Sequence, residues 1–150
     1  MSGVSGVALL DVNVLIALFD PDHVHHEPAH RWFEEQRSIG WATCPLTENG
    51  LLRVLTHPAY SPAAAPPADV LERLRAFCGS GGHAFWPDNV SLRDAELFQA
   101  GAPPSHRQVT DLYLLGLAVK RGGRLATFDR AIPLAKVRGA EAQTLALIPA

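Results

Sequence analysis

Near its N-terminus the chain reads Val7-Ala8-Leu9-Leu10-Asp11, four apolar residues closed by an acid. A short, continuous apolar run predicts a strand that is buried on both faces, as in a parallel sheet. In open α/β sheets, ligands bind at the carboxyl ends of the strands. A carboxylate at such an end is costly to bury unless something compensates its charge. Asp11 therefore predicts a metal or substrate site at this edge of the sheet.

The composition sets the outer limits of the fold and of the function. A chain of 150 residues that is 47% hydrophobic and 19% charged predicts a single domain, residues 1–150, with a substantial core. The net charge of -2 does not fit a protein that binds nucleic acid through charge alone. If cations neutralise the four acids considered below, however, the rest of the surface is mildly basic.

The cysteines and the apolar segments predict where the protein works. Cys44 and Cys78 show no metal-ligand spacing, and nothing in the sequence requires a disulfide between them, so a reduced, cytoplasmic protein is the simpler expectation. Asp11 and Asn13 interrupt the first apolar stretch, and no basic region precedes it, so no signal peptide is predicted. No apolar run is long enough to cross a membrane.

Strands and helices are expected to alternate along the chain, which predicts an α/β fold with a parallel sheet. The predicted strands are Val7–Asp11, Ile39–Cys44, His83–Trp86, Arg124–Thr127 and Thr144–Ile148. The predicted helices are Val14–Phe19, Glu27–Gln36, Leu46–Thr56, Asp69–Phe77, Ser91–Ala100 and Val109–Arg121. Ser91 is the expected N-cap of its helix. Two segments, Pro58–Pro67 and Gly101–Ser105, are expected to be loops within the domain.

Four acids occupy equivalent places in this pattern. Asp11 and Asp129 follow predicted strands, whereas Glu48 and Asp111 lie in the first turns of predicted helices. Helices that follow parallel strands begin at the same sheet edge, so all four carboxylates can converge there. Close carboxylates repel one another, and without a cation at least one would take up a proton. Hard divalent cations such as Mg²⁺ or Mn²⁺ prefer such oxygen ligands, and they activate water for attack on phosphodiesters.

Each of these acids also has a plainer interpretation. Asp11 alone fits a turn, Glu48 and Asp111 alone fit acids at the start of a helix, and Asp129 alone fits a cap for the segment after it. The metal-site hypothesis depends on the occurrence of all four acids at one sheet edge.

The stretches that carry these acids resemble a known family. Their order and spacing are similar to those of the PIN-domain nucleases and, within these, of the VapC-like toxins of bacterial toxin–antitoxin pairs. The stretch His26–Trp32 also resembles the second helix of that subgroup. The segments that carry the resemblance are Leu9–Asn13, Thr47-Glu48, Val109–Leu114 and Gly123–Arg130.

The resemblance implies a PIN-like three-layer α/β/α fold with a central, mostly parallel sheet of about four or five strands. It implies an endoribonuclease that depends on Mg²⁺ or Mn²⁺, forms homodimers and is neutralised by a small antitoxin protein. Asn13 and Thr127 would support the site as polar neighbours. The implied metal ligands and catalytic residues are Asp11, Glu48, Asp111 and Asp129.

Other candidate sites are weaker. His23, His25, His26 and His30 fit no common zinc pattern, and a polar stretch before a helix explains them more simply. Cys44 fits a buried strand thiol better than a nucleophile. The roles of two further sets of residues stay open. His106 and Arg107 could contact phosphate or lie in a solvated loop. The apolar side chains of four helical residues could contact an antitoxin or belong to the core. The four are Leu15, Leu18, Trp32 and Leu52.

Two other functions compete with the nuclease. A haloacid-dehalogenase-like phosphatase also begins with an acid after its first strand, but it needs a second acid where this chain has Asn13. It also needs a lysine in a loop, and the nearest candidate, Lys120, lies on a predicted helix. A non-catalytic domain that binds RNA or protein would keep the fold, but the complete set of four acids argues against it.

Overall fold

The central sheet of the protein is parallel throughout its described part. A computed structural model describes residues 5–61, 65–99 and 105–150. Within these residues five strands pair in the order β3-β2-β1-β4-β5, and each pair is parallel. The prediction of a parallel sheet of four or five strands is therefore confirmed. The strands are β1 (Ala8–Leu10), β2 (Trp41–Thr43), β3 (His83–Phe85), β4 (Arg124–Thr127) and β5 (Leu145–Leu147).

Strand β1 occupies the centre of the sheet. It pairs with β2 on one side, where Leu9 lies opposite Ala42, and with β4 on the other, where Leu9 lies opposite Leu125. All three residues of β1 are fully buried. The uninterrupted apolar run is thus explained, because helices cover both faces of the strand.

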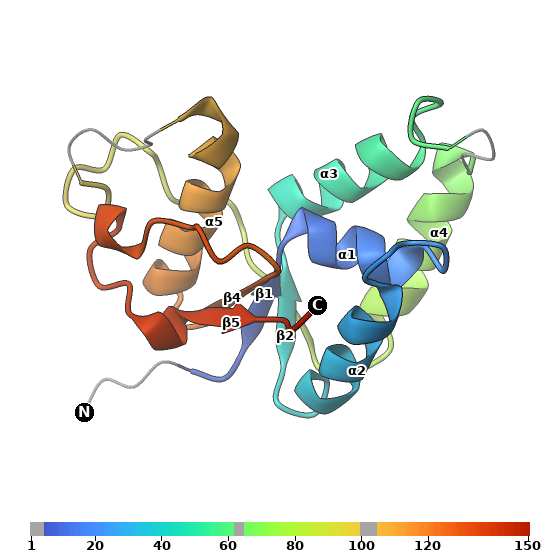
Figure 1. Ribbon diagram of the computed structural model, residues 1–150, viewed down its shortest axis with the longest axis horizontal. Coiled ribbons are helices and arrows are strands. Elements are labelled where there is room, and N and C mark those ends of the chain that lie inside the picture. The colour runs from blue at the N-terminus through green and yellow to red at the C-terminus, as the bar shows by residue number, and fades with distance from the viewer. Residues whose placement is uncertain (1–4, 62–64, 100–104) are drawn as a thin grey trace.

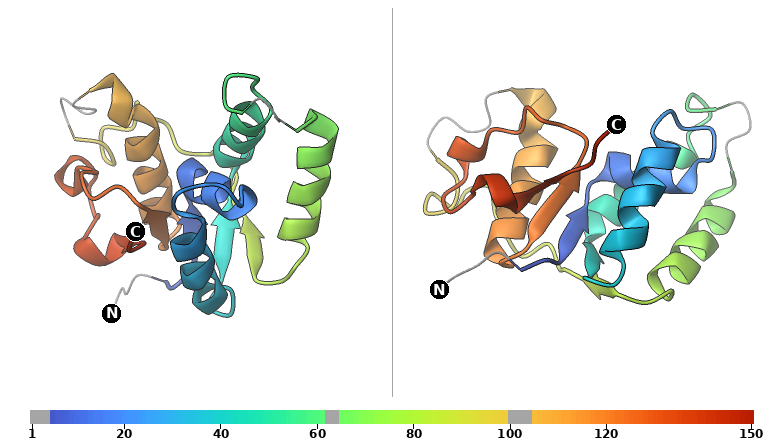
Figure 2. Two further views of the ribbon diagram at one scale, coloured as in Figure 1. Left: turned by 45° about the vertical axis from the view of Figure 1, so that its right-hand side comes forward. Right: turned by 60° about the horizontal axis from the view of Figure 1, so that its bottom comes forward.

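The helices form two layers around the sheet (Figure 1). Side chains of α1, α2, α3 and α4 pack on one face, and those of α5 pack on the other. Figure 2 shows the same separation from two further directions. The three-layer α/β/α arrangement that the family resemblance implied is therefore found. The helices are α1 (Val12–Phe19), α2 (His26–Gln36), α3 (Pro45–Leu55), α4 (Pro67–Cys78) and α5 (Val109–Lys120).

Two histidines of α2 hold the end of α1. His26 Nδ1 lies 2.7 Å from the carbonyl oxygen of Ala17, and His30 Nε2 lies 3.2 Å from that of Leu18. Because a carbonyl oxygen only accepts, each of these ring nitrogens carries the proton. The last carbonyl groups of a helix have no partner within the helix, so these bonds satisfy them. His26 and His30 therefore have a structural role that needs no zinc.

The predicted helix Ser91–Ala100 is wrong. Residues 91–99 form turns, and Ala100 lies outside the described residues. Ser91 Oγ accepts the amide N–H of Arg93 at 3.1 Å, and Asp94 Oδ1 accepts the amide two residues further on at 3.0 Å. Short polar side chains of this kind compete with the backbone bonds of a helix. Phe98, in the same segment, is buried and forms a bridge with Val137.

The other predicted helices and strands occur within two residues of their expected bounds. Both predicted loops are only partly described, because residues 62–64 and 101–104 lie outside the described ranges. Cys44 and Cys78 are both free. No helix in the described ranges is long and apolar enough to span a membrane.

A close contact between α1 and α3 fixes the relative positions of their first turns. A Cβ atom on Gly50 would lie 2.8 Å from Cγ2 of Val12, closer than real Cβ atoms approach. Val12 follows Asp11 directly, and Gly50 lies two residues after Glu48. The absence of a side chain at this point of α3 therefore decides how near the two helix starts can lie.

Replacing Gly50 with Ala should destabilise the protein by about 1–3 kcal/mol, the usual cost of overpacking. The opposite expectation comes from helix propensity alone, which favours Ala over Gly by about 1 kcal/mol. The measurement is urea unfolding of Gly50→Ala, Val12→Ala and the double variant. The double variant should be more stable than the sum of the two single changes predicts, because Val12→Ala removes the clashing methyl groups. A Gly50→Ala variant more stable than the parent would contradict this account.

Candidate active site

Asp11 lies at the point where β1 becomes α1. It is the N-cap residue of α1, and its side chain is only 4% exposed. Its amide N–H donates to the carbonyl oxygen of Ala126 at 3.1 Å, which continues the pairing of β1 with β4. The hydroxyl of Thr127 donates to Asp11 Oδ2 at 3.0 Å. The central strand thus places the buried side chain of Asp11 at the edge of the sheet where the strands end, and Thr127 fixes its orientation.

The surroundings of Asp11 disfavour its charge. Burial raises the pKa of the Asp11 carboxyl, and the nearby charge of Asp129 raises it further. The Thr127 hydroxyl and the amide groups of Val12 and Asn13 lower the pKa and offset part of this effect. Asn13 therefore supports the site through its backbone, while its side chain is exposed.

Asp111 and Asp129 complete a group of three acids with Asp11. Asp111, in the first turn of α5, is half-buried. Burial is the main cause that raises its pKa to about 6, and the charges of Asp11 and Asp129 and a side-chain hydrogen bond with Asp129 add to the shift. Thr127 Oγ1 accepts the amide N–H of Asp129 at 3.1 Å, so one hydroxyl orients two of the three acids.

Glu48 is at the same end of α3 as predicted, but its carboxylate has a different partner. The hydroxyl of Thr43 donates to Glu48 Oε2 at 2.7 Å. The charge of Glu48 also raises the pKa of Cys78, after the larger effect of burial, and partly offsets the lowering of the His83 pKa by burial. The structure thus groups Asp11 with Asp111 and Asp129, and Glu48 with Thr43, Cys78 and His83.

The alternation of side chains along the strands explains this division. Successive residues of a strand point to opposite faces. Leu9 and Leu125 pack on the α5 side, so Asp11 and Thr127, two residues further along β1 and β4, point the same way. Trp41 packs on the side of α1 to α4, and Thr43 therefore points there as well.

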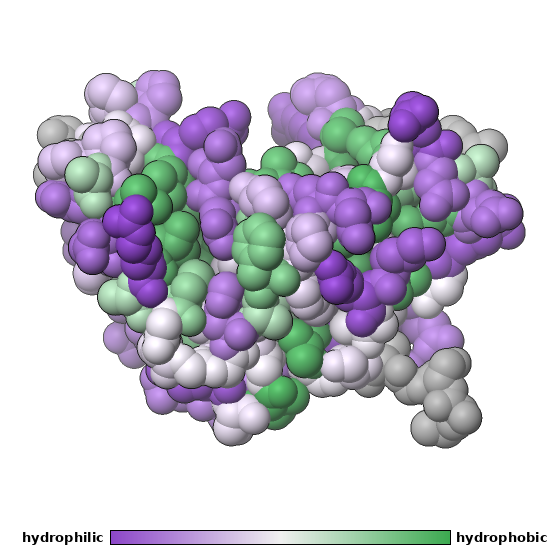
Figure 3. Space-filling view, turned by 180° about the vertical axis from the view of Figure 1, so that it is seen from behind, coloured by the Kyte–Doolittle hydropathy of each residue, from purple (hydrophilic) through white to green (hydrophobic). Residues whose placement is uncertain are grey.

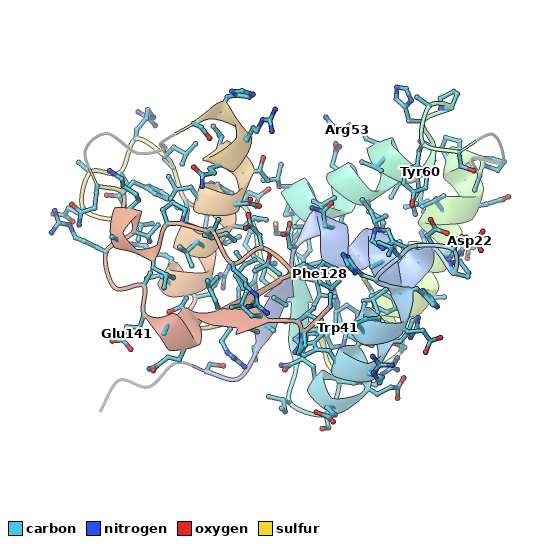
Figure 4. The ribbon with its side chains drawn as sticks, in the orientation of Figure 1. Asp22, Trp41, Arg53, Tyr60, Phe128 and Glu141 are labelled. Carbon is cyan, nitrogen blue, oxygen red and sulfur yellow. The ribbon has the colours of Figure 1, made fainter. Side chains whose placement is uncertain are left out.

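Phe128 follows the same rule at the end of β4. It packs on the side opposite to Thr127, with its ring centroid 4.8 Å from that of His25. Figure 4 shows Phe128 near the middle of the molecule, between α1 and the part of the chain that contains α5. Seen from behind, the molecule is hollowed between two raised parts (Figure 3). In the view of Figure 1 this hollow lies at the edge of the molecule between α3 and the start of α5.

The group of three acids fits a hard divalent cation. Three carboxylates held this close repel when all are charged, and a cation relieves this repulsion. Mg²⁺ and Mn²⁺ bind through a few carboxylate oxygens and keep positions for water or phosphate oxygens. The fixed orientation of Asp11 by Thr127 is the kind of support that such ligands need.

The PIN domain model matches residues 8–139, a segment that contains all four acids. The chain belongs to the PIN domain family. It is 47% identical over 125 residues to Ribonuclease VapC39 of Mycobacterium tuberculosis, covering 83% of this chain and 90% of that protein. It is 45% identical over 141 residues to Ribonuclease VapC44 of the same organism, covering 94% of this chain and 99% of that protein. Ribonuclease VapC38 is 47% identical over 126 residues, 84% of this chain and 87% of that protein.

Membership in the PIN domain family argues against the alternative of a haloacid-dehalogenase-like phosphatase. The thiol nucleophile is also disfavoured, because Cys44 is buried and burial raises its pKa to about 11. His106 and Arg107 are exposed just before α5. Among the apolar candidates for a protein contact, two are core residues, whereas the other two are half-buried and pack against the core. The first pair is Leu15 and Leu18, and the second is Trp32 and Leu52.

Three side chains near Glu48 had no signal in the sequence. Thr43 lies within a strand, and Cys78 and His83 are separated by a glycine-rich turn that fits no common metal pattern. Only the pairing of β2 with β3, which sets Trp41 opposite His83, brings His83 near Thr43. No spacing rule along one segment could have found them.

The raised pKa of Asp111 should be visible as a pH dependence of stability in the absence of divalent cations. The folded pKa of about 6 lies above the ordinary value of 3.8, so between these pH values the folded protein holds a proton that the unfolded chain has released. The contribution of Asp111 to stability therefore falls as pH rises through this range. We expect the free energy of unfolding of the parent, minus that of Asp111→Asn, to decrease from about pH 4 to about pH 6 and then to level off.

The measurement is urea unfolding in EDTA across this range. Asp69→Asn is the matched control, because Asp69 occupies the first turn of α4 and is exposed. A difference between the parent and Asp111→Asn that does not change with pH would show that the carboxyl is not held in a charge-disfavouring site.

Proposed function

We propose that this protein is a metal-dependent endoribonuclease and the toxin component of a toxin–antitoxin pair. The relatives named as ribonucleases, which align with most of this chain, support the cleavage of RNA. The observation that carries the proposal is the convergence of Asp11, Asp111 and Asp129 at the carboxyl edge of a parallel sheet, with the pKa of two of them raised. A group of acids whose charges repel favours a bound cation, and the open coordination positions of Mg²⁺ or Mn²⁺ can accept the phosphate oxygens of RNA.

Asp11, Asp111 and Asp129 would hold Mg²⁺ or Mn²⁺, and Glu48 would join them by turning its side chain from Thr43. When bound, such a cation activates water for attack on a phosphodiester bond and stabilises the leaving oxygen. The protein's own residues supply orientation and charge. Thr127 holds the Asp11 carboxylate in place through its hydroxyl and positions the backbone of Asp129. Asp111 would release its proton to solvent on binding a cation, so cation affinity should increase as pH rises through about 6.

The N-terminal ends of α1 and α5 lie at the same edge and add to the binding of an anion. The first amide groups of a helix carry partial positive charge, which favours phosphate. In α1 part of this effect acts on Asp11 itself, because the amide groups of Val12 and Asn13 lower the pKa of its carboxyl. Asn13 and Thr127 are thus supports of the proposed site and not primary ligands.

Isosteric removal of the charges should abolish RNA cleavage. We expect Asp11→Asn, Asp111→Asn and Asp129→Asn each to lower the cleavage rate on the order of a hundredfold or more, since even residues that only support metal ligands contribute about 10–100-fold. The folded state should persist, because each change keeps the size of the side chain. The assay is cleavage of a pool of cellular RNAs with Mg²⁺ or Mn²⁺ and with EDTA, followed by mapping of the ends.

Asp69→Asn is the control for a charge change away from the site. A parent protein that binds RNA but does not cleave it with either metal would favour the non-catalytic alternative. Glu48→Gln separately tests the fourth acid: a normal rate in that variant would remove Glu48 from the proposed ligand set while leaving the other three.

We further propose a cognate antitoxin as partner, a homodimer as the assembly and the cytoplasm as the place of action. The two free cysteines are compatible with a reduced compartment. A basic segment of an antitoxin would meet the three carboxylates and compete with metal and RNA. The assignment as a toxin is tested by coexpression with the product of the adjacent upstream reading frame, which should copurify and inhibit cleavage at stoichiometric amounts. If it neither copurifies nor inhibits, the protein is a nuclease without this partner. Light scattering during size-exclusion chromatography measures the oligomeric state.

A further inference from the structure

Glu48 belongs to a compact group of three side chains that differ in chemistry from the aspartates. One carboxylate oxygen of Glu48, the Cys78 sulfur and one imidazole nitrogen of His83 all lie within 4.8 Å of one another. They come from three elements: the first turn of α3, the last residue of α4 and the first residue of β3. All three side chains are half-buried, so the group is formed by the fold and is still within reach of solvent.

Thr43 organises this group. Its hydroxyl donates to Glu48 Oε2 at 2.7 Å, and it lies 2.7 Å from His83 Nε2. A hydroxyl has one proton, so His83 Nε2–H is the donor in the second bond and the lone pair of a neutral imidazole lies on Nδ1. A change of tautomer moves this proton to Nδ1 and frees Nε2 as a ligand. Thr43 can continue to donate to Glu48 in either case.

We propose that Glu48, Cys78 and His83 form a binding site for a thiophilic divalent cation such as Zn²⁺, and that occupation of this site inhibits the nuclease by withholding Glu48 from the aspartates. The second half of the proposal rests on the proposed function. The first half is a property of the fold alone.

The donor set distinguishes this site from that of the aspartates. A thiolate, an imidazole and a carboxylate select Zn²⁺ over Mg²⁺, whereas an all-carboxylate group favours the harder ion. Three protein ligands with a fourth position for water is a common arrangement for zinc. Bonds of about 2.0–2.3 Å hold the ligand atoms of a tetrahedral zinc ion on the order of 3.5 Å apart. The ligand atoms, which all lie within 4.8 Å of one another, need to approach by little more than about an ångström at most, which side-chain rotation can supply. The Cys78 thiol releases its proton to solvent as the metal binds.

The coupling between the two sites follows from geometry. The Thr43 side of the sheet is the side of α1 to α4, and the Asp11 side is that of α5. Thr43 holds Glu48 Oε2 on the side of α1 to α4, so Glu48 would have to turn away from Thr43 to join the aspartates. A cation held by Cys78 and His83 stabilises the Glu48 position seen here. The affinity of the aspartate group for its own cation then falls, since that group is left with three acids. Linkage requires the reverse as well: Mn²⁺ at the aspartates should weaken Zn²⁺ binding if it recruits Glu48.

Direct binding tests the site without any assay of RNA cleavage. The probe is Co²⁺ added to the full-length protein in excess Mg²⁺, followed by displacement with Zn²⁺. We expect one equivalent to give the intense near-ultraviolet absorption of a cobalt–thiolate bond. Cys78→Ser should lose this band, and His83→Ala should weaken Zn²⁺ binding at least tenfold. Cys44→Ala is the matched control, because it removes the other cysteine and should keep the band.

A second signal comes from Trp41, whose ring centroid lies 4.7 Å from that of His83. Figure 4 shows Trp41 beside the sheet, on the side that carries α2. Co²⁺ bound at His83 should quench the fluorescence of Trp41 in the parent and not in His83→Ala. A band that survives in Cys78→Ser, or Zn²⁺ affinity that is unchanged in both Cys78→Ser and His83→Ala, overturns the site.

Cleavage assays test the coupling. With Mg²⁺ or Mn²⁺ in large excess, Zn²⁺ near one equivalent should slow RNA cleavage by the parent and by Cys44→Ala at least tenfold. Cleavage by Cys78→Ser and by His83→Ala should not be slowed by Zn²⁺, when the rate of each variant is compared with its own rate without Zn²⁺. Equal inhibition of all four proteins overturns the regulatory role, because Zn²⁺ would then act at the aspartates. Retention of full Zn²⁺ affinity by Glu48→Gln overturns the sharing of Glu48. If the parent cleaves no RNA, the proposed function fails, and the cobalt band still decides the metal site.

Discussion

The structure depends on one buried carboxylate at the end of its central strand. Strand β1 is covered on both faces and paired on both sides, so Asp11 follows it into a place where water cannot stabilise its charge. Burial raises its pKa, and hydrogen bonds from Thr127 and the start of α1 only partly offset the cost. A site that holds such a group without full compensation is suited to receive a cation, and Asp111 and Asp129 are arranged around it accordingly.

The two-residue period of strands divides the chemistry of this edge between the faces of the sheet. On the α5 side the end of the sheet has aspartates oriented by Thr127, and this all-oxygen group is the proposed site of a hard cation. On the other side Thr43 joins Glu48 to His83, with Cys78 nearby, and this mixed group is the proposed site of a softer cation. In each group a threonine hydroxyl forms hydrogen bonds to two of the other residues. Glu48 belongs to the second group, but it lies in the first turn of a helix and not in a strand, so no pleat fixes the side to which it turns.

Failures of sequence-based prediction were local and had local causes. The segment after β3 has apolar residues at helical spacing, but Ser91 and Asp94 use their side chains to form turns, and Phe98 packs beside the C-terminal segment. The histidine-rich stretch offered metal ligands by residue type, whereas His26 and His30 instead satisfy carbonyl groups at the end of α1. In both cases a polar side chain found a backbone partner, which hydrophobic periodicity cannot report.

The sequence by itself determined the alternation of strands and helices, the burial of β1 and the presence of four acids at the start of helices or the end of strands. These features depend on short-range rules: continuous apolar runs, helical spacing and the common edge at which parallel strands end. Only the tertiary structure decided which acids lie together. Strand order, the face to which each residue points and the rotamer of Glu48 depend on contacts between segments far apart in the chain, such as Thr127 with Asp11 and Thr43 with His83. Those contacts are set by packing, because the position of a side chain depends on which hydrogen-bonding groups the neighbouring helices and strands place within its reach.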